Sequence, residues 1–214
     1  MTLRQGENLG FVRANNVGVN AGKGTWLALL NPDAEAEPGW LDAMMQAVVE
    51  HLDHRMVSSL QLNLHNPTKL DGAGDNYLAY GYAWCGGFGH PASRAPPAGE
   101  CFGPYGAAAL YPRALFLEAG GFDGRYFCCH EDVDIDFRLR LSGEKCQFAP
   151  AARIRHAGSA VTGRNSRFSI FHGVRNGVWT YAKNMPGGWL ALTLPVWFLG
   201  AILFLIRGLF RGAF

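Results

Sequence analysis

The sequence changes character abruptly at residues 25–33, TWLALLNPD, where a short apolar run ends in Asn31-Pro32-Asp33, and this junction constrains the fold more than any other feature. A Leu-rich run of this length is typical of a buried strand that delivers polar residues at its carboxyl end. Directly after it, Pro38 opens a segment in which apolar residues recur at helical spacing. The junction therefore predicts a strand, an acidic loop and a helix in succession.

The remaining segments are predicted to form further helices and strands around one long irregular region. Between residues 71 and 106 the composition shifts to Gly, Pro and aromatic residues with little periodicity, which predicts long loops and one hairpin. Long loops in a compact domain are usually functional or mobile. Apolar spacing and terminal Gly and Pro residues predict helices at 11–20, 112–121 and 131–143, and strands at 56–64 and 147–156.

Charge and cysteine content limit the classes of function. The chain has 19 basic and 17 acidic residues, a net charge of +2, which is too balanced for a polyanion-binding surface, so no nucleic-acid partner is expected. Its 5 cysteines are odd in number and lack CxxC spacing, which disfavours a disulfide framework and a zinc site. The polar N-terminus does not resemble a secretory signal, and a cytoplasmic compartment is favoured.

The last part of the chain differs from the rest. From Asn184 to Ile206 no residue is charged, and the stretch approaches the roughly 20 apolar residues needed to cross a bilayer core, although Pro195 would kink a helix there. We therefore expect a globular domain at residues 1–183 and a hydrophobic membrane-associated segment at residues 184–214. A full span and a helix lying on the membrane are equal alternatives, and a buried core helix is the third.

Asp33 is the first candidate site residue, with Asn31 beside it at the same strand end. A divalent cation that bridges a diphosphate prefers hard oxygen ligands in a loop with room for phosphate, and a carboxylate just past a strand supplies one. An Asp after Pro is equally common in turns. Spacing alone leaves both interpretations open.

The second candidate is the acidic helix start at Glu131 and Asp132, with Asp134 and Asp136 behind it. Carboxylates this close cannot all be ionised cheaply if they are buried together, so at least one is expected to have a raised pKa and to serve as a general base. Acids in a first turn also stabilise a helix, by about 0.3–1 kcal/mol each. We assign the later two acids to i,i+4 ion pairs with arginines on an exposed face, and keep Glu131 and Asp132 for function.

His156 is the third candidate, at the end of a predicted strand and next to small and hydroxyl residues. A neutral imidazole there can ligate a metal or contact phosphate. A lone His is more often a structural residue with satisfied hydrogen bonds, so the position by itself favours the structural role.

Taken in order, these segments resemble glycosyltransferase family 2, most closely its rhamnosyltransferase-like members. The resemblance rests on NLGFVRANNVGVNAGKGTWLALLNPDAEAEPGWL, on FGPYGAAALYPRALFLEAGGFDGRYF, on HEDVDIDFRLRLSG, and on the run from Pro150 through HAGS to VRNGVWTYAKNMP. Each motif is weak alone, but together they have the order and spacing of the family. The resemblance implies a nucleotide-diphospho-sugar transferase (GT-A) fold, an α/β sandwich around a central sheet.

The resemblance also implies how a nucleotide-sugar donor is held. Asp33 is similar to the metal-binding carboxylate of the Asp-x-Asp-like motif, with Asn31 in place of its first acid, so Mg²⁺ or Mn²⁺ is the expected cofactor. Gly106 and Ala107 fall in the loop expected to border the donor sugar and the acceptor. His156 falls where the family often places a residue near the diphosphate.

Asp132 matches the catalytic base of the family, which takes the proton from the acceptor hydroxyl, and Glu131 matches its usual companion. The transition state is oxocarbenium-like, so the leaving diphosphate needs positive charge and the incoming hydroxyl needs a base on the opposite face. One base and one metal suffice for a single displacement with inversion at the anomeric carbon.

The expected activity is therefore inverting transfer of a sugar to a saccharide or lipid-linked acceptor in bacterial cell-surface polysaccharide synthesis, at the cytoplasmic face of the inner membrane. Rhamnose from dTDP-rhamnose is the first expected donor, and a UDP-hexose is the second. Both donors come from the resemblance.

The sequence departs from the family at both ends. Members begin with a strand and helix that hold the nucleotide base, including a Val-Asp-Asn-like turn, and nothing before Asn8 supplies them, while RGLFRGAF ends inside the membrane-proximal region. We therefore expect an N-terminally incomplete catalytic domain that binds the nucleotide weakly. The alternative function is a non-catalytic, membrane-tethered remnant that acts as an interaction module.

Overall fold

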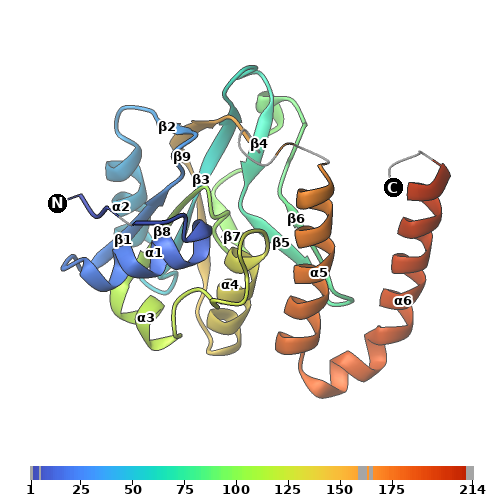
Figure 1. Ribbon diagram of the computed structural model, residues 1–214. Helices are drawn as coiled ribbons and strands as arrows, with labels where there is room; N and C mark the ends of the chain where they lie inside the picture. The colour runs from blue at the N-terminus through green and yellow to red at the C-terminus, as the bar shows by residue number, and fades with distance from the viewer. Residues whose placement is uncertain (1, 5, 159–162, 164–165, 211–214) are drawn as a thin grey trace.

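The computed structural model describes the chain except residues 1, 5, 159–162, 164–165 and 211–214. Its main sheet is built from Trp26–Leu30 (β1), Ala34–Ala36 (β2), Met56–Asn63 (β3), Leu70–Ala73 (β4), Gly99–Cys101 (β7), Ala108–Pro112 (β8) and Cys146–His156 (β9). The strand order is β1-β8-β3-β9-β2, with β4 paired to β3 and β7 paired to β9 (Figure 1). Asp75–Leu78 (β5) and Tyr82–Cys85 (β6) form a separate antiparallel hairpin.

Helices cover both faces of this sheet and extend beyond one end of it. They are Gly10–Ala21 (α1), Trp40–Glu50 (α2), Arg113–Glu118 (α3), Glu131–Leu141 (α4), Arg167–Asn184 (α5) and Gly187–Phe210 (α6). Figure 1 shows α5 and α6 at the end of the molecule opposite α2.

The side chains of β8 show how the layers are held together. Ala109 and Tyr111 belong to the hydrophobic cluster formed with α1, α3 and α4, whereas Ala108 and Leu110 belong to the cluster formed with α2. Successive strand residues point to opposite faces, so a strand covered on both sides is apolar throughout. A sheet between two helical layers confirms the predicted α/β class.

The predicted succession of strand, acidic loop and helix is present as β1, the loop after it and α2. The expectation that this strand is buried was wrong. In the described sheet β1 is the terminal strand and pairs with β8, and only Leu29 is fully buried while Leu30 is 42% exposed. A terminal strand has one neighbour instead of two, which leaves its outer side accessible.

The region predicted to be irregular holds β4 and β7 as well as the expected hairpin, β5–β6. Glycine has a low strand propensity, so the sequence gives little sign of these strands. The packing of the region nevertheless requires glycine at these positions. A side chain at Gly72 would collide with the sulfur of Cys85, and Gly74 adopts a left-handed φ of 78°. Close packing of neighbouring side chains and a left-handed backbone therefore explain a composition that resembles a loop.

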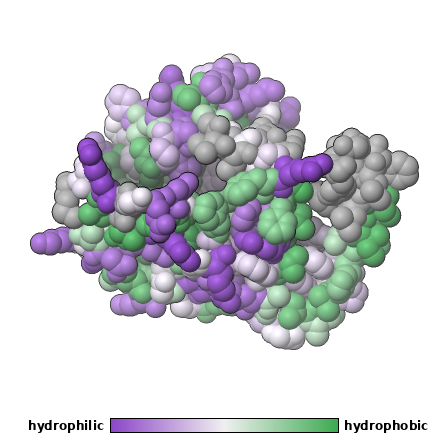
Figure 2. Space-filling model, in the orientation of Figure 1, coloured by the Kyte–Doolittle hydropathy of each residue, from purple (hydrophilic) through white to green (hydrophobic). Residues whose placement is uncertain are grey.

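The C-terminal helix α6 contacts α5 through a few residues. The Tyr181 hydroxyl lies 2.8 Å from the Thr193 hydroxyl, and the Tyr181 ring stacks on Trp197 with centroids 5.7 Å apart. Other large side chains of α6 stay exposed, including Leu192 at 68% and Leu203 at 57%, and Figure 2 shows this hydrophobic edge at the right of the view. The third alternative, a buried core helix, is therefore wrong.

The expected membrane-spanning segment finds no support. Among the residues that the structure describes, none of the helices combines the length and the apolar character that crossing a bilayer requires.

Candidate active site

One cavity of about 700 Å³ is lined by every candidate residue that the sequence suggested. These are Asn31, Asp33, Gly106, Ala107, Glu131, Asp132 and His156. They come from the loop after β1, the loop before β8, the first turn of α4 and the end of β9. The structure thus brings all of them together, and their individual roles stay predictions.

Strand pairing explains part of this convergence. Leu30 ends β1 and pairs with Ala108, which begins β8, so the loops that adjoin these residues meet at one edge of the sheet. The N–H of Asn31 donates to the carbonyl oxygen of Ala107 at 2.9 Å. The register of two strands therefore places the expected donor-binding loop beside the expected metal-binding loop.

His156 lies between two carboxylates. Its Nε2 atom is 3.2 Å from Asp33 Oδ1, and its Nδ1 atom is 2.7 Å from Asp71 Oδ2. Burial alone would lower the pKa of His156, but the hydrogen bond to Asp71 and the charges of Asp71 and Asp33 outweigh it and raise the pKa above its ordinary value. The Asp71 carboxylate also fixes the orientation of the ring, as carboxylates do for metal-bound imidazoles.

The donor set fits a cation that is shared with a substrate. Asp33 and His156 both line the cavity and hold one carboxylate oxygen and one imidazole nitrogen 3.2 Å apart, and Asp71 contacts the opposite side of the imidazole. Within the described ranges, no three His, Cys, Asp or Glu residues are grouped so that they could hold a metal ion by themselves. Two protein ligands leave coordination positions for phosphate oxygens and water, as Mg²⁺ normally requires.

Asp132 is held at the start of α4. Its Oδ2 atom accepts a hydrogen bond from the N–H of Gly106 at 3.0 Å, and its Oδ1 atom accepts one from the N–H of Val133 at 2.8 Å. A Cβ atom at Gly106 would lie only 2.8 Å from Asp132 Oδ2. Glycine at this position therefore permits the backbone to orient the carboxylate.

Glu131 is buried next to Asp132, and its surroundings change its own charge state. Burial, followed by the negative charge of Asp132, raises the pKa of Glu131 to about 8. Glu131 is therefore largely protonated at neutral pH. This agrees with the expectation that closely spaced buried carboxylates cannot all ionise.

The turn before α4 adopts a conformation that is unusual for its residues. Cys129 and His130 both have a φ of 67°, which costs of order 1–3 kcal/mol for a residue other than glycine. From α5, the buried side chain of Asn176 donates hydrogen bonds to the carbonyl oxygens of Cys128 and Cys129, each at 2.8 Å. Sequence reasoning gave Asn176 no role, although it lies in one of the segments that carry the resemblance.

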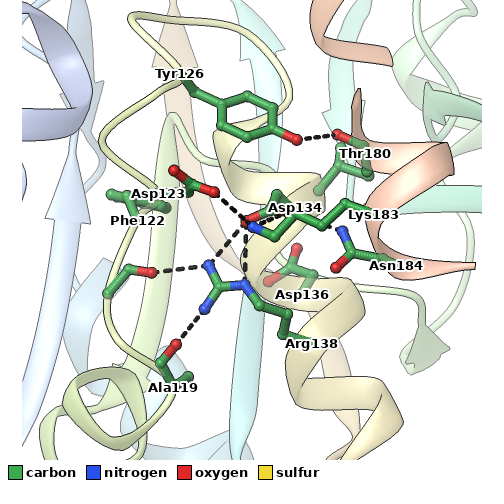
Figure 3. A network of polar contacts seen from close by, with 12 residues as sticks. Ala119, Phe122, Asp123, Tyr126, Asp134, Asp136, Arg138, Thr180, Lys183 and Asn184 are labelled. Carbon is green, nitrogen blue, oxygen red and sulfur yellow. Dashed lines mark hydrogen bonds and ion pairs between the residues drawn. The ribbon is translucent and has the colours of Figure 1, made fainter. Parts of the chain in front are cut away.

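Asp134 is the centre of a polar network between α4 and α5 (Figure 3). Its carboxylate is fully buried and contacts Arg138 at 2.9 Å, Lys183 at 2.9 Å and the side-chain amide of Asn184 at 2.8 Å. The expected i,i+4 pair with Arg138 is present. The expectation that it lies on an exposed face was wrong, because α5 covers this side of α4.

Asp136 does not form the expected i,i+4 pair. Its Oδ1 atom accepts a hydrogen bond from the Tyr111 hydroxyl at 2.9 Å, and its side chain is fully buried. Arg140 instead pairs with Glu100 at 2.6 Å. Helical spacing could not reveal this, because Tyr111 reaches Asp136 from the central sheet.

Comparison with known proteins shows which family the chain resembles. A family model described as "Glycosyltransferase like family 2" matches residues 2–176. The N-acetylglucosaminyl-diphospho-decaprenol L-rhamnosyltransferase of Mycobacterium tuberculosis is 26% identical over 216 residues, which covers 87% of this chain and 68% of that protein. A probable N-acetylgalactosaminyltransferase 9 of Caenorhabditis elegans is also 26% identical, over 88% of this chain and 34% of that protein.

Solved structures include a similar fold. A crystal structure of GalNAc-T7 with UDP, GalNAc and Mn²⁺ superimposes with a TM-score of 0.63 at 16% identity, over 84% of this chain and 36% of that chain. This likeness supports the GT-A fold, and the chain spans about a third of that structure. Because the family match covers most of its length, the chain belongs to glycosyltransferase family 2.

Proposed function

We propose that this glycosyltransferase moves a sugar from a nucleotide diphosphate to an acceptor hydroxyl with inversion at the anomeric carbon. The observation that carries the proposal is that the oriented carboxylate of Asp132 and the Asp33–His156 pair line one cavity. A single displacement needs a base for the incoming hydroxyl and stabilisation of the leaving diphosphate. Family membership favours this enzyme over a non-catalytic interaction module.

The residues of the site have complementary tasks in this reaction. A divalent cation, Mg²⁺ or Mn²⁺, would be held by Asp33 and His156 and would supply positive charge to the leaving diphosphate. Asp132 accepts the proton of the acceptor hydroxyl as that oxygen bonds to the anomeric carbon. The N–H of Gly106 keeps the carboxylate oriented, and protonated Glu131 does not compete for the proton.

The donor and acceptor are proposed from the relatives. We propose dTDP-rhamnose as donor, a lipid-linked saccharide as acceptor, and cell-surface polysaccharide synthesis as the setting. The name of the mycobacterial relative supports this choice, as does the O-antigen biosynthesis protein RfbC of Myxococcus xanthus, which is 29% identical over 68% of this chain and 12% of that protein. A UDP-sugar is the second candidate, supported by the UDP complex of the structural relative.

We also propose that α6 lies on a membrane and holds the enzyme at the cytoplasmic face of the bacterial inner membrane. The support is the hydrophobic surface formed by the exposed side chains of Trp189, Leu192, Leu199, Ile202 and Leu203. Water-exposed apolar surface of this extent is unfavourable, and a helix that lies in the membrane interface buries it.

Transfer from labelled donors tests the function. The chain would be mixed with Mn²⁺, a polyprenyl-diphosphate-linked N-acetylglucosamine acceptor, and either dTDP-rhamnose or a UDP-hexose. We expect a disaccharide product whose new glycosidic bond has the anomeric configuration opposite to that of the donor, measured by NMR. Retention of configuration would contradict the single displacement, and no transfer from any donor would contradict the function.

A further inference from the structure

Three residues that line the cavity each have a buried polar atom that makes no hydrogen bond to any residue that the structure describes. These atoms are Asp75 Oδ2, His130 Nδ1 and Glu131 Oε2. A buried donor or acceptor without a partner costs about 1–3 kcal/mol, and native proteins contain few. A group of them on one cavity points to a ligand that supplies the missing hydrogen bonds.

Asp75 is the member of this group that the proposed mechanism does not use. It is the first residue of β5 and is 4% exposed. Its N–H donates to the carbonyl oxygen of Gly103 at 2.9 Å, and its carbonyl oxygen accepts from the N–H of Phe102 at 3.1 Å. The backbone is thus fixed on both sides, and the Oδ2 atom of the side chain is left without a hydrogen-bond partner among the described residues.

The surroundings of Asp75 decide what kind of ligand suits it. Burial raises the pKa of Asp75 well above its ordinary value, and the negative charges of Asp132 and Asp136 raise it further. Both effects favour the neutral form, and a neutral carboxyl group is a poor metal ligand. It has one O–H donor and one free acceptor oxygen, which is the complement of an alcohol that both donates and accepts.

We propose that Asp75 is a ligand for sugar hydroxyl groups, in a subsite that His130 and Glu131 complete beside Asp132. The inference rests on the proposed function, which makes a saccharide the occupant of the cavity. The acceptor sugar fits best, because a hydroxyl next to the reacting one would lie near the base. The sugar of the donor carries the same chemistry and is the other source.

The replacement of Asp75 by leucine and by asparagine separates hydrogen bonding from shape. Asp75→Leu keeps the approximate size but removes both donor and acceptor, so we expect the acceptor KM to rise about tenfold or more. Asp75→Asn keeps one donor and one acceptor in place of the neutral carboxyl, so we expect its KM to stay within about threefold of the unmodified enzyme. Asp75→Ala replaces the leucine variant if that variant does not fold.

Asp136→Leu is the matched control, and Asp136→Ala replaces it if it does not fold. Asp136 is as deeply buried as Asp75 and also has an unpartnered Oδ2 atom, but it bonds to Tyr111 and lies outside the cavity wall. Its variant should lower the melting temperature without changing the KM of either substrate. The contrast distinguishes substrate binding from the general cost of changing a buried acid.

The donor sugar is tested by calorimetry, which compares the affinity for the nucleotide sugar with the affinity for the free nucleotide diphosphate. A higher acceptor KM in Asp75→Leu assigns the acceptor sugar, and a lost preference for the nucleotide sugar over the nucleotide assigns the donor sugar. Unchanged values in both measurements, in a folded variant, would overturn the proposal. If the unmodified enzyme transfers no sugar, the proposed function fails, and calorimetry with nucleotide sugar and free saccharide still tests Asp75.

Discussion

The Nδ1 atom of His156 lies 2.7 Å from the Oδ2 atom of Asp71, and this contact leaves Nε2 directed at Asp33. The pair joins the end of β9 to β4, across the sheet edge that borders the cavity. An imidazole held by a carboxylate presents its second nitrogen in a fixed direction, and such outer partners typically change metal affinity by 10–100-fold. The proposed cation site therefore depends on a residue that is not one of its proposed ligands.

Removal of Asp33 is expected to uncouple metal binding from nucleotide binding. In the unmodified chain, Mn²⁺ should bind measurably only when UDP or dTDP is present, because the protein supplies two ligands and the diphosphate supplies others. Asp33→Ala should abolish this coupling and leave the melting temperature nearly unchanged, because Asp33 lies at the cavity surface. Equal nucleotide affinity with and without Mn²⁺ in the unmodified chain, measured by calorimetry, would exclude Asp33 from the site.

Asp132→Asn is expected to remove the base and to leave donor binding nearly intact. Loss of a general base typically lowers the rate about 10²–10⁴-fold, and the amide keeps the size of the side chain. The matched change is Glu131→Gln, which should be much milder because Glu131 is already protonated at neutral pH. Single-turnover transfer rates decide between them. An unchanged rate in Asp132→Asn, with a loss in Glu131→Gln, would transfer the role of base to Glu131.

The raised pKa of Glu131 also predicts how the stability of the fold depends on pH. Its pKa rises on folding from an ordinary 4.5 to about 8, so between these values the folded chain holds a proton that the unfolded chain has released. The free energy of unfolding should therefore fall as pH rises through this window, by at most about 1.4 kcal/mol per pH unit. Denaturant titrations from pH 5 to 8 should show a smaller fall for Glu131→Gln. Parallel curves would contradict the raised pKa.

Asp33, Asp132 and His156 could be picked out as candidates from the sequence because each stands at the end of an element and has a local signal, whereas Gly106 and Ala107 came from the family resemblance alone. Asp33 follows an apolar run, and Asp132 stands in the first turn of a periodic helix. Ends of this kind meet at a sheet edge in α/β folds, so their proximity follows from general topology. The structure places them on one cavity accordingly.

Asp71 and Asp75 could not be found in this way. Both lie in a glycine-rich stretch where Gly72 and Gly74 weaken the strand signal. Their importance depends on a β3–β4 pairing and on a hairpin that only the folded chain reveals. The burial of Asp134 was missed for a similar reason, because its partners on α5 are distant in sequence and carry no helical spacing relative to it.

Asn176 is expected to position Asp132, the proposed base, through the turn that precedes α4. Asn176→Ala removes the two hydrogen bonds to the carbonyl oxygens of Cys128 and Cys129, and the left-handed conformation at Cys129 then loses its support. We expect kcat to fall about tenfold or more while the donor affinity is retained.

Asn184→Ala is the matched control for Asn176→Ala. Asn184 is a buried asparagine on the same helix, and it donates to Asp134 instead of to the turn. Its loss should lower the free energy of unfolding by about 1–3 kcal/mol and leave kcat nearly unchanged. Equal effects of both variants on kcat would mean that α5 only stabilises the domain.

The last prediction concerns the hydrophobic surface of α6, because membrane binding and packing use different residues there. Leu192, Leu199 and Leu203 are more than half exposed, whereas Trp197 stacks on the buried ring of Tyr181. Replacement of the three leucines by glutamine should abolish sedimentation with phospholipid vesicles and leave the melting temperature unchanged, since burial in lipid gives roughly 1.5–3 kcal/mol per leucine. Trp197→Ala should lower the melting temperature and leave sedimentation with vesicles unchanged, because it removes an aromatic contact between α5 and α6 but leaves the leucines in place. If the glutamine variant still binds vesicles and instead changes from dimer to monomer in analytical ultracentrifugation, the surface binds a second copy of the chain and the proposed membrane contact is wrong.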